Sequence, residues 1–485
     1  MTTRTETKRD TRFFGHPLGL ANLFGVEMWE RFSFYGMQGI LAIYLYYSAA
    51  EGGLGMAKAS ALGIVGAYGS LVYLSTIVGA WVADRLLGAE RTLFFSALLI
   101  MIGHIGLAVL PGYTGILVGL LCVAFGSGGL KGNATAVVGT LYDELDERRD
   151  GGFTIFYMGV NLGAFFGPLC TGLAQTGLGF HYGFGLAAIG MAVGLIQYTI
   201  GRRNLGTRAS TVPNPLPAGR RPAAAGVLVA VVAVVLVAVF TGLVTAGNLA
   251  TVATWVAAVA AVGYFLVILT SGKITGVERR RVLSFIPMFI ASAAFWALYQ
   301  QQFTVLAAYS DQRLDRDLFG WVMPVSWVQS INPVFIIALA PVFALVWTKL
   351  GARQPTTPVK FAFGTGVMGV AFLLFLPMAG GGPNSAPLLA MVGIVLLFTV
   401  AELSLSPVGL SLATKLAPEA FRTQMVALFF LSVSLGSALS GSLAQYYSAD
   451  HEAAYFGILG AVAIAIGAAL AAVSPFVSRL MSGVR

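Results

Sequence analysis

Three ionisable residues, Glu27, Glu30 and Arg31, lie inside an otherwise apolar run at residues 19–47. Each costs roughly 2.5–3.5 kcal/mol near the centre of a membrane helix, so a chain that keeps them has a partner or a task for them. Helical spacing places Glu27, Arg31 and Tyr35 on one face, and this face must therefore meet a polar environment. The alternative is that Glu27 and Arg31 only neutralise each other for insertion, but this would leave Glu30 over.

Two further ionisable residues lie well inside other apolar runs. Lys131 occurs in the sequence Gly-Leu-Lys-Gly-Asn, and Glu402 occurs in Val-Ala-Glu-Leu-Ser. Long charged side chains near helix ends can reach back to the membrane interface, and this is the alternative interpretation. Because both residues are far from the ends of their runs, we expect them to face a polar cavity.

The composition is that of a polytopic membrane protein. Of the 485 residues, 57% are hydrophobic and 10% are charged, whereas a soluble domain carries about 25% charged residues. The net charge of +9 comes from basic residues in short loops, which is the positive-inside pattern and predicts no nucleic-acid partner. We expect no secretory signal at the N-terminus. Cys122 and Cys170 lie in separate runs without a CxxC motif, so neither a disulfide nor a metal site is predicted.

Fourteen apolar runs are long enough to cross a membrane as helices, which takes about 17–25 residues each. They fall into a group of six, a pair rich in Ala and Val, and a second group of six. The predicted spans are residues 19–47, 61–83, 92–110, 114–140, 153–174, 183–201, 224–242, 249–270, 282–306, 327–348, 359–379, 386–414, 424–446 and 454–477.

The loops orient the chain and divide it. Lys and Arg gather in alternate loops, while turns on the other side such as residues 111–115 and 380–385 carry none, so both termini are predicted to be cytoplasmic. The predicted parts are a cytoplasmic N-terminus (1–18), an N-terminal six-helix bundle (19–201), a Pro- and Arg-rich cytoplasmic linker (202–223), a lipid-facing accessory hairpin (224–270), a basic cytoplasmic loop (271–281), a C-terminal six-helix bundle (282–478) and a cytoplasmic C-terminus (479–485).

Three motifs resemble those of a known family. Residues 27–36 are similar to the ExxERFxYYG signature in the first helix of the proton-dependent oligopeptide transporter (POT/PTR) family, a branch of the major facilitator superfamily. Residues 156–165 are similar to its second signature. In a loop motif of the superfamily, Asp84 and Arg85 would steady one conformation, with Asp84 capping or pairing with a helix. The resemblance implies an all-α membrane protein with 14 transmembrane helices: the major facilitator fold, as two six-helix bundles plus an inserted two-helix hairpin.

The resemblance implies a proton-coupled symporter that imports di- and tripeptides across the bacterial inner (cytoplasmic) membrane by alternating access. Its partners would be peptides, protons and membrane lipid, with no cofactor beyond the proton as coupling ion, and it would function as a monomer. Glu27, Glu30 and Glu402 against Arg31 and Lys131 leave one net negative charge. A zwitterionic peptide adds none, so one bound proton would neutralise the loaded cavity.

The resemblance also implies how the two ends of a peptide are held. Opposite charges at opposite ends of a cavity suit a zwitterion and leave its side chains little read. The carboxylate would be taken by Arg31, Tyr35 and Lys131, and the amine would be held by Asn161, Asn332 and Glu402.

Proton coupling is predicted to rest on Glu27, Glu30 and Glu402, and an ion pair between Lys131 and Glu402 is predicted to close the inner side. For the aromatic members of the predicted pocket, packing within the bundles is the open alternative. The further pocket residues predicted are Phe34, Gln38, Tyr68, Trp296, Gln300, Ser406 and Phe429.

Several positions depart from the family pattern. Phe34 replaces the first Tyr of the YYG sequence, Gly132 replaces a Pro, and Phe429 stands where a Trp is common. Some members pair an Arg at the position of Gln38 with an acid at the position of Gln300, as a gate on the outer side. Losing both ends of this pair at once avoids a single unpaired buried charge.

The sequence leaves two other functions to consider. A transporter of the same fold could carry another small solute, such as nitrate, a drug or another metabolite, but members that carry nitrate typically lack the complete ExxER set. An intramembrane enzyme would need a nucleophile with a base or a metal motif such as HExxH. The sequence contains no such motif, so we predict that the chain is not an enzyme.

Overall fold

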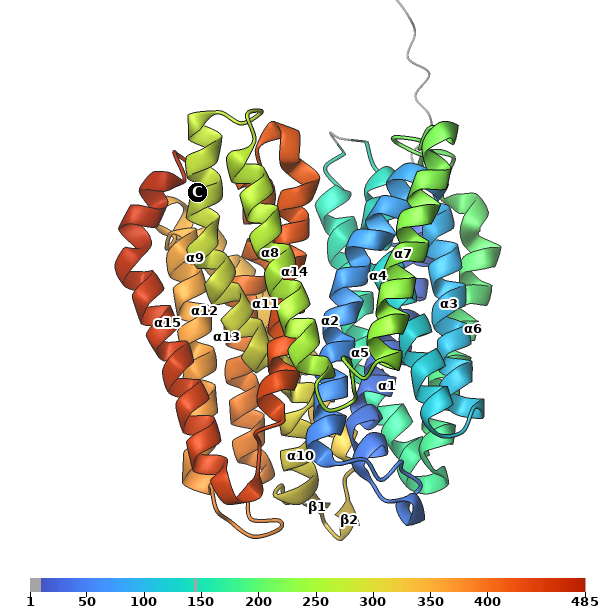
Figure 1. Ribbon diagram of the computed structural model, residues 1–485, viewed down its shortest axis with the longest axis vertical. Coiled ribbons are helices and arrows are strands. Elements are labelled where there is room, and N and C mark those ends of the chain that lie inside the picture. Colours follow the sequence, from blue (N-terminus) through green and yellow to red (C-terminus); the bar gives the residue numbers. More distant parts are fainter. Residues whose placement is uncertain (1–9, 144–145, 485) are drawn as a thin grey trace, which may run out of the picture.

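The computed structural model describes residues 10–143 and 146–484, and the predictions for residues 1–9 and 485 lie outside this part. Nearly all of it is helical, and the long helices stand side by side in two groups (Figure 1). Within the described residues, 13 helices are long and apolar enough to cross a membrane. The fourteenth of the predicted spans is the first helix, α1 (Leu18–Tyr46), which is not among these 13 and carries three charged residues, Glu27, Glu30 and Arg31.

The first six long helices form the N-terminal bundle. Its helices after α1 are α2 (Lys58–Val82), α3 (Ala89–Val109), α4 (Gly112–Thr140), α5 (Arg149–Leu178) and α6 (Phe180–Gly201). Short turns connect them or lie in the linker that follows: η1 (Ala49–Glu51), η2 (Ala83–Leu87), η3 (Arg202–Asn204), η4 (Arg208–Ser210) and η5 (Ala218–Arg220).

The C-terminal bundle begins with a broken helix and contains a small hairpin of two strands. Its long helices are α9 (Gly276–Tyr299), α11 (Ile331–Leu350), α12 (Thr357–Leu373), α13 (Leu388–Leu416), α14 (Arg422–Ala444) and α15 (Glu452–Leu480). The shorter elements are η6 (Gln300–Phe303), α10 (Val305–Gln312), β1 (Asp317–Leu318), β2 (Trp321–Val322), η7 (Val325–Ser330), η8 (Gly351–Arg353), η9 (Leu376–Met378), η10 (Glu419–Phe421) and η11 (Ala449–His451).

The first helix of this bundle differs from the predicted span 282–306 at both ends. It starts at Gly276 because Thr275 and Glu278 form a capping box, in which the Glu278 N–H donates to Thr275 Oγ1 (3.2 Å) and the Thr275 N–H donates to Glu278 Oε2 (2.8 Å). The predicted basic loop 271–281 therefore lies partly in α9. At the other end, Thr304 (φ −118°, ψ −92°) leaves the helical conformation and separates η6 from α10.

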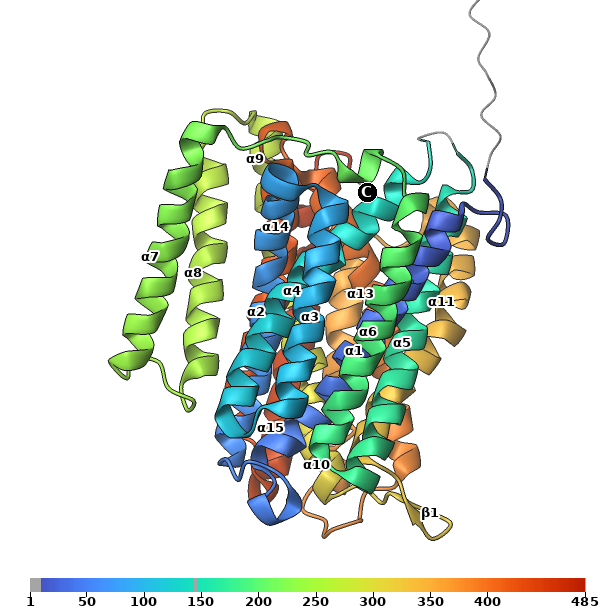
Figure 2. The same ribbon diagram turned by 90° about the vertical axis from the view of Figure 1, so that its right-hand side faces the viewer.

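The accessory hairpin consists of α7 (Arg221–Phe240) and α8 (Leu249–Thr270) and stands beside the bundles (Figure 2). No residue of α7 is buried, as expected for a helix that faces lipid. The helix α8 packs one face against α14, where Thr254 Oγ1 and Ser442 Oγ lie 3.0 Å apart. The accessory hairpin is thus held against the bundles by α8.

The long helices give the molecule two ends. The terminal end carries both described termini (top of Figure 1). The hairpin end is named after the β1–β2 hairpin that it carries, and not after the accessory hairpin α7–α8 (bottom of Figure 1). Toward the hairpin end, η7, the turn before α11, donates hydrogen bonds to the backbone of α5 in the N-terminal bundle. Ser326 Oγ donates to the Pro168 carbonyl (2.8 Å), Trp327 Nε1 to that of Leu169 (3.1 Å), and Ser330 Oγ to that of Phe165 (2.8 Å).

The bundles also meet closely between α2 and α14. A methyl group added at Gly66 would lie within 3 Å of the backbone of Gly441, so only glycine allows this approach. One turn along, Ser70 Oγ and Ser434 Oγ form a hydrogen bond of 2.8 Å across the interface. These contacts close the molecule from its middle to the hairpin end.

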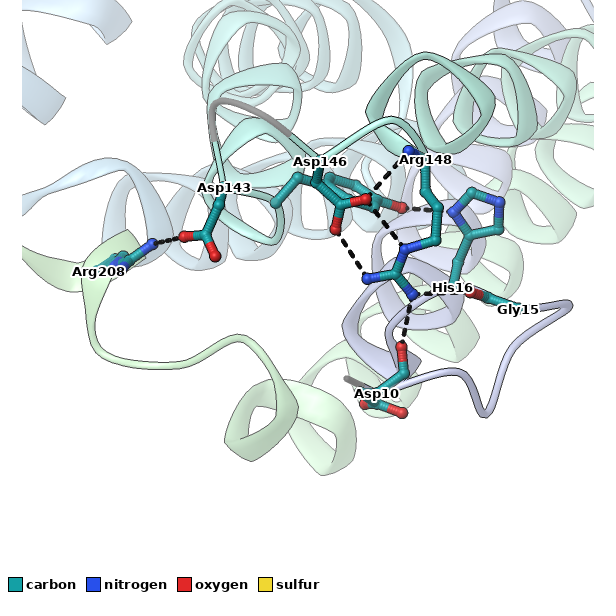
Figure 3. Close-up of polar contacts among 8 residues, drawn as sticks. Asp10, Gly15, His16, Asp143, Asp146, Arg148 and Arg208 are labelled. Atoms are coloured by element: carbon teal, nitrogen blue, oxygen red, sulfur yellow. Dashed lines mark hydrogen bonds and ion pairs between the residues drawn. The ribbon is translucent and has the colours of Figure 1, made fainter. Parts of the chain in front are cut away.

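At the terminal end, the segment before α1 is fastened to the loop between α4 and α5 (Figure 3). Arg148 donates to the Asp10 carbonyl (3.0 Å) and to the Asp146 carboxylate (2.8 Å), and His16 Nδ1 lies 2.9 Å from the Tyr142 hydroxyl. The start of α1 is therefore tied to the helix pair α4–α5.

The Asp10 side chain also stabilises the start of α1. Its carboxylate accepts from the Leu18 N–H (3.0 Å) and from Arg12 Nε (3.0 Å). The Arg12 guanidinium holds the pKa of Asp10 below its usual value, so the carboxylate is charged, as suits the positive end of a helix dipole.

The loop with the superfamily motif does not make the contact expected of it. We predicted that the Asp84 side chain would cap or pair with a helix, but it is exposed, and no hydrogen bond or ion pair of that side chain is found among the described residues. Instead the backbone acts: the carbonyls of Asp84 and Arg85 accept from the N–H groups of Asn214 (3.0 Å) and Leu216 (2.9 Å). The loop thus holds the linker between the bundles.

Candidate functional site

A cavity lies between the two bundles, at the middle of the long helices. The elements that form it are α1 and α5 on one side, and α9, η6, η7, α11 and α13 on the other. Four of its residues, Tyr35, Asn161, Asn332 and Glu402, are predicted site residues. The complete lining is Tyr35, Tyr157, Val160, Asn161, Ala164, Tyr299, Gln302, Phe303, Gln329, Asn332, Pro333, Ile336 and Glu402.

Glu402 is held in this cavity by neutral groups. Its Oε2 atom accepts from the Tyr299 hydroxyl (2.8 Å) and from Asn332 Nδ2 (3.2 Å), and Asn332 Nδ2 also lies 3.0 Å from Thr399 Oγ1. Among the described residues, no Lys, Arg or His lies within ion-pair distance of Glu402, and no hydrogen bond is made by its Oε1. The cavity therefore contains a carboxyl group that can accept a proton or a cationic ligand.

The helix breaks bring the partners of Glu402 to it. Tyr299 is the last residue of α9, and Asn332 is the second residue of α11. Thr399 lies one turn before Glu402 on α13, so both face the same way. The end of α9 and the start of α11 thus converge on one carboxyl group of α13.

The opposite side of the cavity is formed by α5 and α1. Asn161 is buried, and its Nδ2 donates to the Tyr157 carbonyl (2.9 Å), which leaves its Oδ1 atom as an acceptor. The Tyr157 side chain lies one turn nearer the terminal end and is 48% exposed. Tyr35 stacks on Phe303 with ring centroids 6.0 Å apart. Because the hairpin end is closed, the cavity is reached from the terminal end.

One turn from Tyr35 on α1, the predicted charged residues form a compact cluster. Arg31 Nη2 lies 2.6 Å from Glu27 Oε1, and Arg31 Nε lies 3.2 Å from Glu30 Oε2. Ser127 of α4 donates to Glu30 Oε1 (2.9 Å). Arg31 therefore bridges two buried acids, which goes beyond the simple pair with Glu27, and buried charges persist only when they are compensated in this way.

Lys131 of α4 lies beside this cluster and not beside Glu402. Its ammonium group is 4.7 Å from the ring centroid of Phe34 and 4.7 Å from that of Tyr73. The predicted ion pair between Lys131 and Glu402 is not formed by these described residues, because contacts with aromatic rings of its own bundle hold the ammonium group. Such contacts contribute about 0.5–2 kcal/mol each.

The charges therefore divide unequally between the bundles. Glu27 and Glu30 against Arg31 and Lys131 sum to zero when all four are ionised. Glu402, on the C-terminal bundle, remains as one negative charge without a cationic partner among the described residues. The net charge of the predicted site is thus carried by Glu402.

The structure places the remaining predicted pocket residues around this cavity but not in its lining. Phe34 stacks on Tyr68, with centroids 6.3 Å apart, and Trp296 packs edge-on against Tyr299, at 5.2 Å. Phe429 is buried against Phe430, at 5.7 Å. For Tyr68, Trp296 and Phe429, packing inside the bundles is what the structure shows.

The polar members of the predicted pocket are also outside the lining. Gln300 Nε2 donates to Ser437 Oγ on its own bundle (3.0 Å), and Gln38 is buried with no partner for its Oε1 among the described residues. Ser406 is half-buried on α13. Because both side chains are uncharged amides, no ion pair joins Gln38 to Gln300.

Sequence reasoning missed several residues of the site. Tyr157 precedes Asn161 by four residues and Gln329 precedes Asn332 by three, so helical spacing from the predicted residues could have found both. Tyr73 faces Lys131 from another helix, and nothing in its local sequence announces this contact. The further lining residues that were not predicted are Val160, Ala164, Tyr299, Gln302, Phe303, Pro333 and Ile336.

One known protein family matches most of the chain. A sequence profile described as the POT family matches residues 90–462 of the chain. This covers more than half of the chain and includes α4, α5, α11 and α13, which carry Lys131, Asn161, Asn332 and Glu402.

Individual relatives match over nearly the full length. The chain is 42% identical to an uncharacterized transporter, YclF, of Bacillus subtilis over 97% of this chain and 96% of the relative. It is 40% identical to a di-/tripeptide transporter of Lactococcus lactis subsp. cremoris over 99% of both chains. A crystal structure of a peptide transporter POT in complex with sulfate is 44% identical, covers 98% of both chains and superposes with a TM-score of 0.94.

Proposed function

The chain belongs to the POT family, a branch of the major facilitator superfamily, and we propose from this that it imports di- and tripeptides together with protons. The Lactococcus lactis relative is named a di-/tripeptide transporter, and the structure that superposes with a TM-score of 0.94 is named a peptide transporter. The family and its members are transporters and not enzymes, and the many membrane-spanning helices make the chain a multi-pass membrane protein.

One observation supports peptide and proton binding at the same site. Glu402 faces the cavity with neutral donors only, while the cationic residues Arg31 and Lys131 belong to the other bundle. The amine of a peptide would sit at Glu402 with the two amides Asn161 and Asn332. Its carboxylate would sit toward Tyr35 and the cationic residues. The distribution of charge thus suits a zwitterion.

Proton coupling is proposed to follow from the same charge balance. A proton on Glu402, Glu27 or Glu30 would neutralise the loaded site. Closing the two bundles around a neutral site costs far less than burying a charged one in a low-dielectric interior. Transfer of Lys131 from the Phe34 and Tyr73 rings to Glu402 would then close the terminal end while the hairpin end opens.

The proposed topology places the terminal end in the cytoplasm and the hairpin end outside, in the cytoplasmic membrane of a bacterium, with a monomer as the functional unit. The basic residues support this orientation, because loops at the terminal end contain the Lys and Arg that the positive-inside rule assigns to the cytoplasm. The cavity described above would then be open to the inside.

We expect purified chain in proteoliposomes to accumulate labelled dialanine when the external solution is more acidic than the lumen. With equal pH on both sides, accumulation above the external concentration should be lost, because protons then supply no driving force. Uptake of labelled dialanine would be measured against protein-free liposomes. Uphill accumulation of dialanine without any proton or voltage gradient would contradict symport. Uptake of labelled nitrate by vesicles that take up no dialanine would favour the other-solute alternative.

A further inference from the structure

A second group of polar contacts joins the two bundles at the hairpin end, away from the cavity. Tyr46 Oη donates to Asp311 Oδ2 (2.9 Å), and Tyr47 Oη donates to Asp311 Oδ1 (2.6 Å). The two tyrosines end α1 of the N-terminal bundle, and Asp311 lies in the last turn of α10 of the C-terminal bundle. One carboxylate thus receives two hydrogen bonds from across the bundle interface.

The end of α1 is built so that both tyrosines reach the same carboxylate. Tyr46 is the last residue of α1 and Tyr47 is its C-cap. The Tyr47 N–H still bonds to the Ile43 carbonyl, and its φ of −60° places its side chain as in a helix, whereas its ψ of 145° ends the helix. The two rings pack edge to face with centroids 5.5 Å apart, so the two hydroxyls reach the same carboxylate from adjacent positions.

Two cationic side chains lie near the contact between the tyrosines and Asp311. Arg316 Nη2 lies 3.9 Å from Asp311 Oδ1, and the Lys58 ammonium group lies 5.1 Å from the ring centroid of Tyr46. The Asp311 side chain is only 12% exposed. Hydrogen bonds to an ionised acceptor are about twice as strong as those between neutral groups, and partial burial limits screening by water.

We infer that Tyr46, Tyr47 and Asp311 form the outer latch, a contact that holds the hairpin end closed and must break each time the transporter opens outward. Gln38 and Gln300 are uncharged, and Gln300 is bonded to Ser437 within its own bundle. At the hairpin end, the Asp311 carboxylate accepts a hydrogen bond from each of the two tyrosines of the other bundle. This inference deepens the proposed alternating access and rests on it for its role in transport.

The inference is tested by the exposure of a residue that is buried only while the hairpin end is closed. Ser326 is 1% exposed and its hydroxyl donates to the Pro168 carbonyl across the interface. A cysteine would replace Ser326 in a chain in which Cys122 and Cys170 are changed to alanine. Its labelling by a membrane-impermeant maleimide added outside intact cells would be timed, with a cysteine in place of the fully exposed Phe319 as the accessible reference.

In this background Asp311→Asn should speed labelling at position 326 about tenfold, a shift of ~1.4 kcal/mol in the closed–open equilibrium. Tyr47→Phe, which removes one hydroxyl only, should speed it by a smaller factor. The matched control is Asp315→Asn, because Asp315 is exposed in the same segment and its carboxylate accepts from the nearby Asp317 N–H (3.2 Å). Labelling at position 319 should be equally fast in every variant.

Equal labelling rates at position 326 for Asp311→Asn and Asp315→Asn would overturn the inference. If Asp311→Asn failed to fold, Tyr47→Phe would decide in the same way. The labelling needs neither peptide nor a proton gradient. A wild type that labels as expected but takes up no dialanine would therefore refute the proposed function and leave the outer latch standing.

Discussion

Glu402→Gln should lower dialanine uptake at least about 100-fold while the protein stays folded. The amide keeps the size of the side chain and an oxygen that can accept from Tyr299 and Asn332. It removes the one cavity charge that has no cationic partner among the described residues. Breaking a partly buried ion pair with the peptide amine costs about 3 kcal/mol or more, and ~2.7 kcal/mol already corresponds to 100-fold. Initial uptake rates in proteoliposomes measure this.

A substrate without the amine charge separates this role from a general defect. N-acetyl-dialanine should be a poor substrate of the wild type, because it cannot pair with Glu402. The Glu402→Gln variant should treat dialanine and its acetyl form alike, since changes at the two partners of one contact are not additive. Glu419→Gln, at an exposed position, is the matched control. If Glu402→Gln retained more than half of the uptake, the assignment of the amine site would be wrong.

Arg31→Gln should destabilise the protein as well as abolish uptake. Arg31 bridges Glu27 and Glu30, which are 2% and 0% exposed. Its removal leaves two buried carboxylates against Lys131 alone, and loss of one partner of a buried ion pair costs about 3–5 kcal/mol. Thermal unfolding of the purified protein in detergent should show the loss, whereas Arg91→Gln, at an exposed position of α3, should not.

A second change should restore folding without restoring transport. In Glu27→Gln with Arg31→Gln, the remaining Glu30 and Lys131 again balance, so the unfolding temperature should return close to that of the wild type. Dialanine uptake should stay lost, because the proposed contact with the peptide carboxylate is gone. A double variant that transports dialanine would show that the α1 cluster acts only in folding.

The membrane spans could be predicted because the cost of polar groups in lipid makes apolar length informative. The same cost identified Glu27, Glu30, Arg31, Lys131 and Glu402 as residues that face something other than lipid. Such arguments rest on one segment at a time. They succeeded for thirteen of the fourteen predicted spans, which are helices long and apolar enough to cross a membrane, and for the placement of Glu402 in a cavity.

What could not be predicted depends on contacts between segments. The break after Tyr299 has no proline to mark it, and nothing in the local sequence announces the conformation of Thr304 (φ −118°, ψ −92°). The early start of α9 is different, because the capping box of Thr275 and Glu278 is visible in the sequence.

The partners of charged side chains were the least predictable feature. Opposite charge predicts a pair between Lys131 and Glu402, but two aromatic rings of its own bundle hold Lys131 here. Nothing in the sequence singles out Asp311, because a carboxylate near the end of a span is ordinary and its two tyrosines are more than 260 residues away. Opposite charge gives the chemistry of a contact, whereas the conformation decides which contact is made.

The most direct test of the account is whether peptide entry carries protons. Proteoliposomes containing a pH-sensitive dye in the lumen would be given external dialanine at equal pH, with the membrane potential held at zero by potassium and valinomycin. The account predicts that dialanine acidifies the lumen in the wild type and not in Glu402→Gln. Entry of labelled dialanine into wild-type vesicles without any acidification would contradict it.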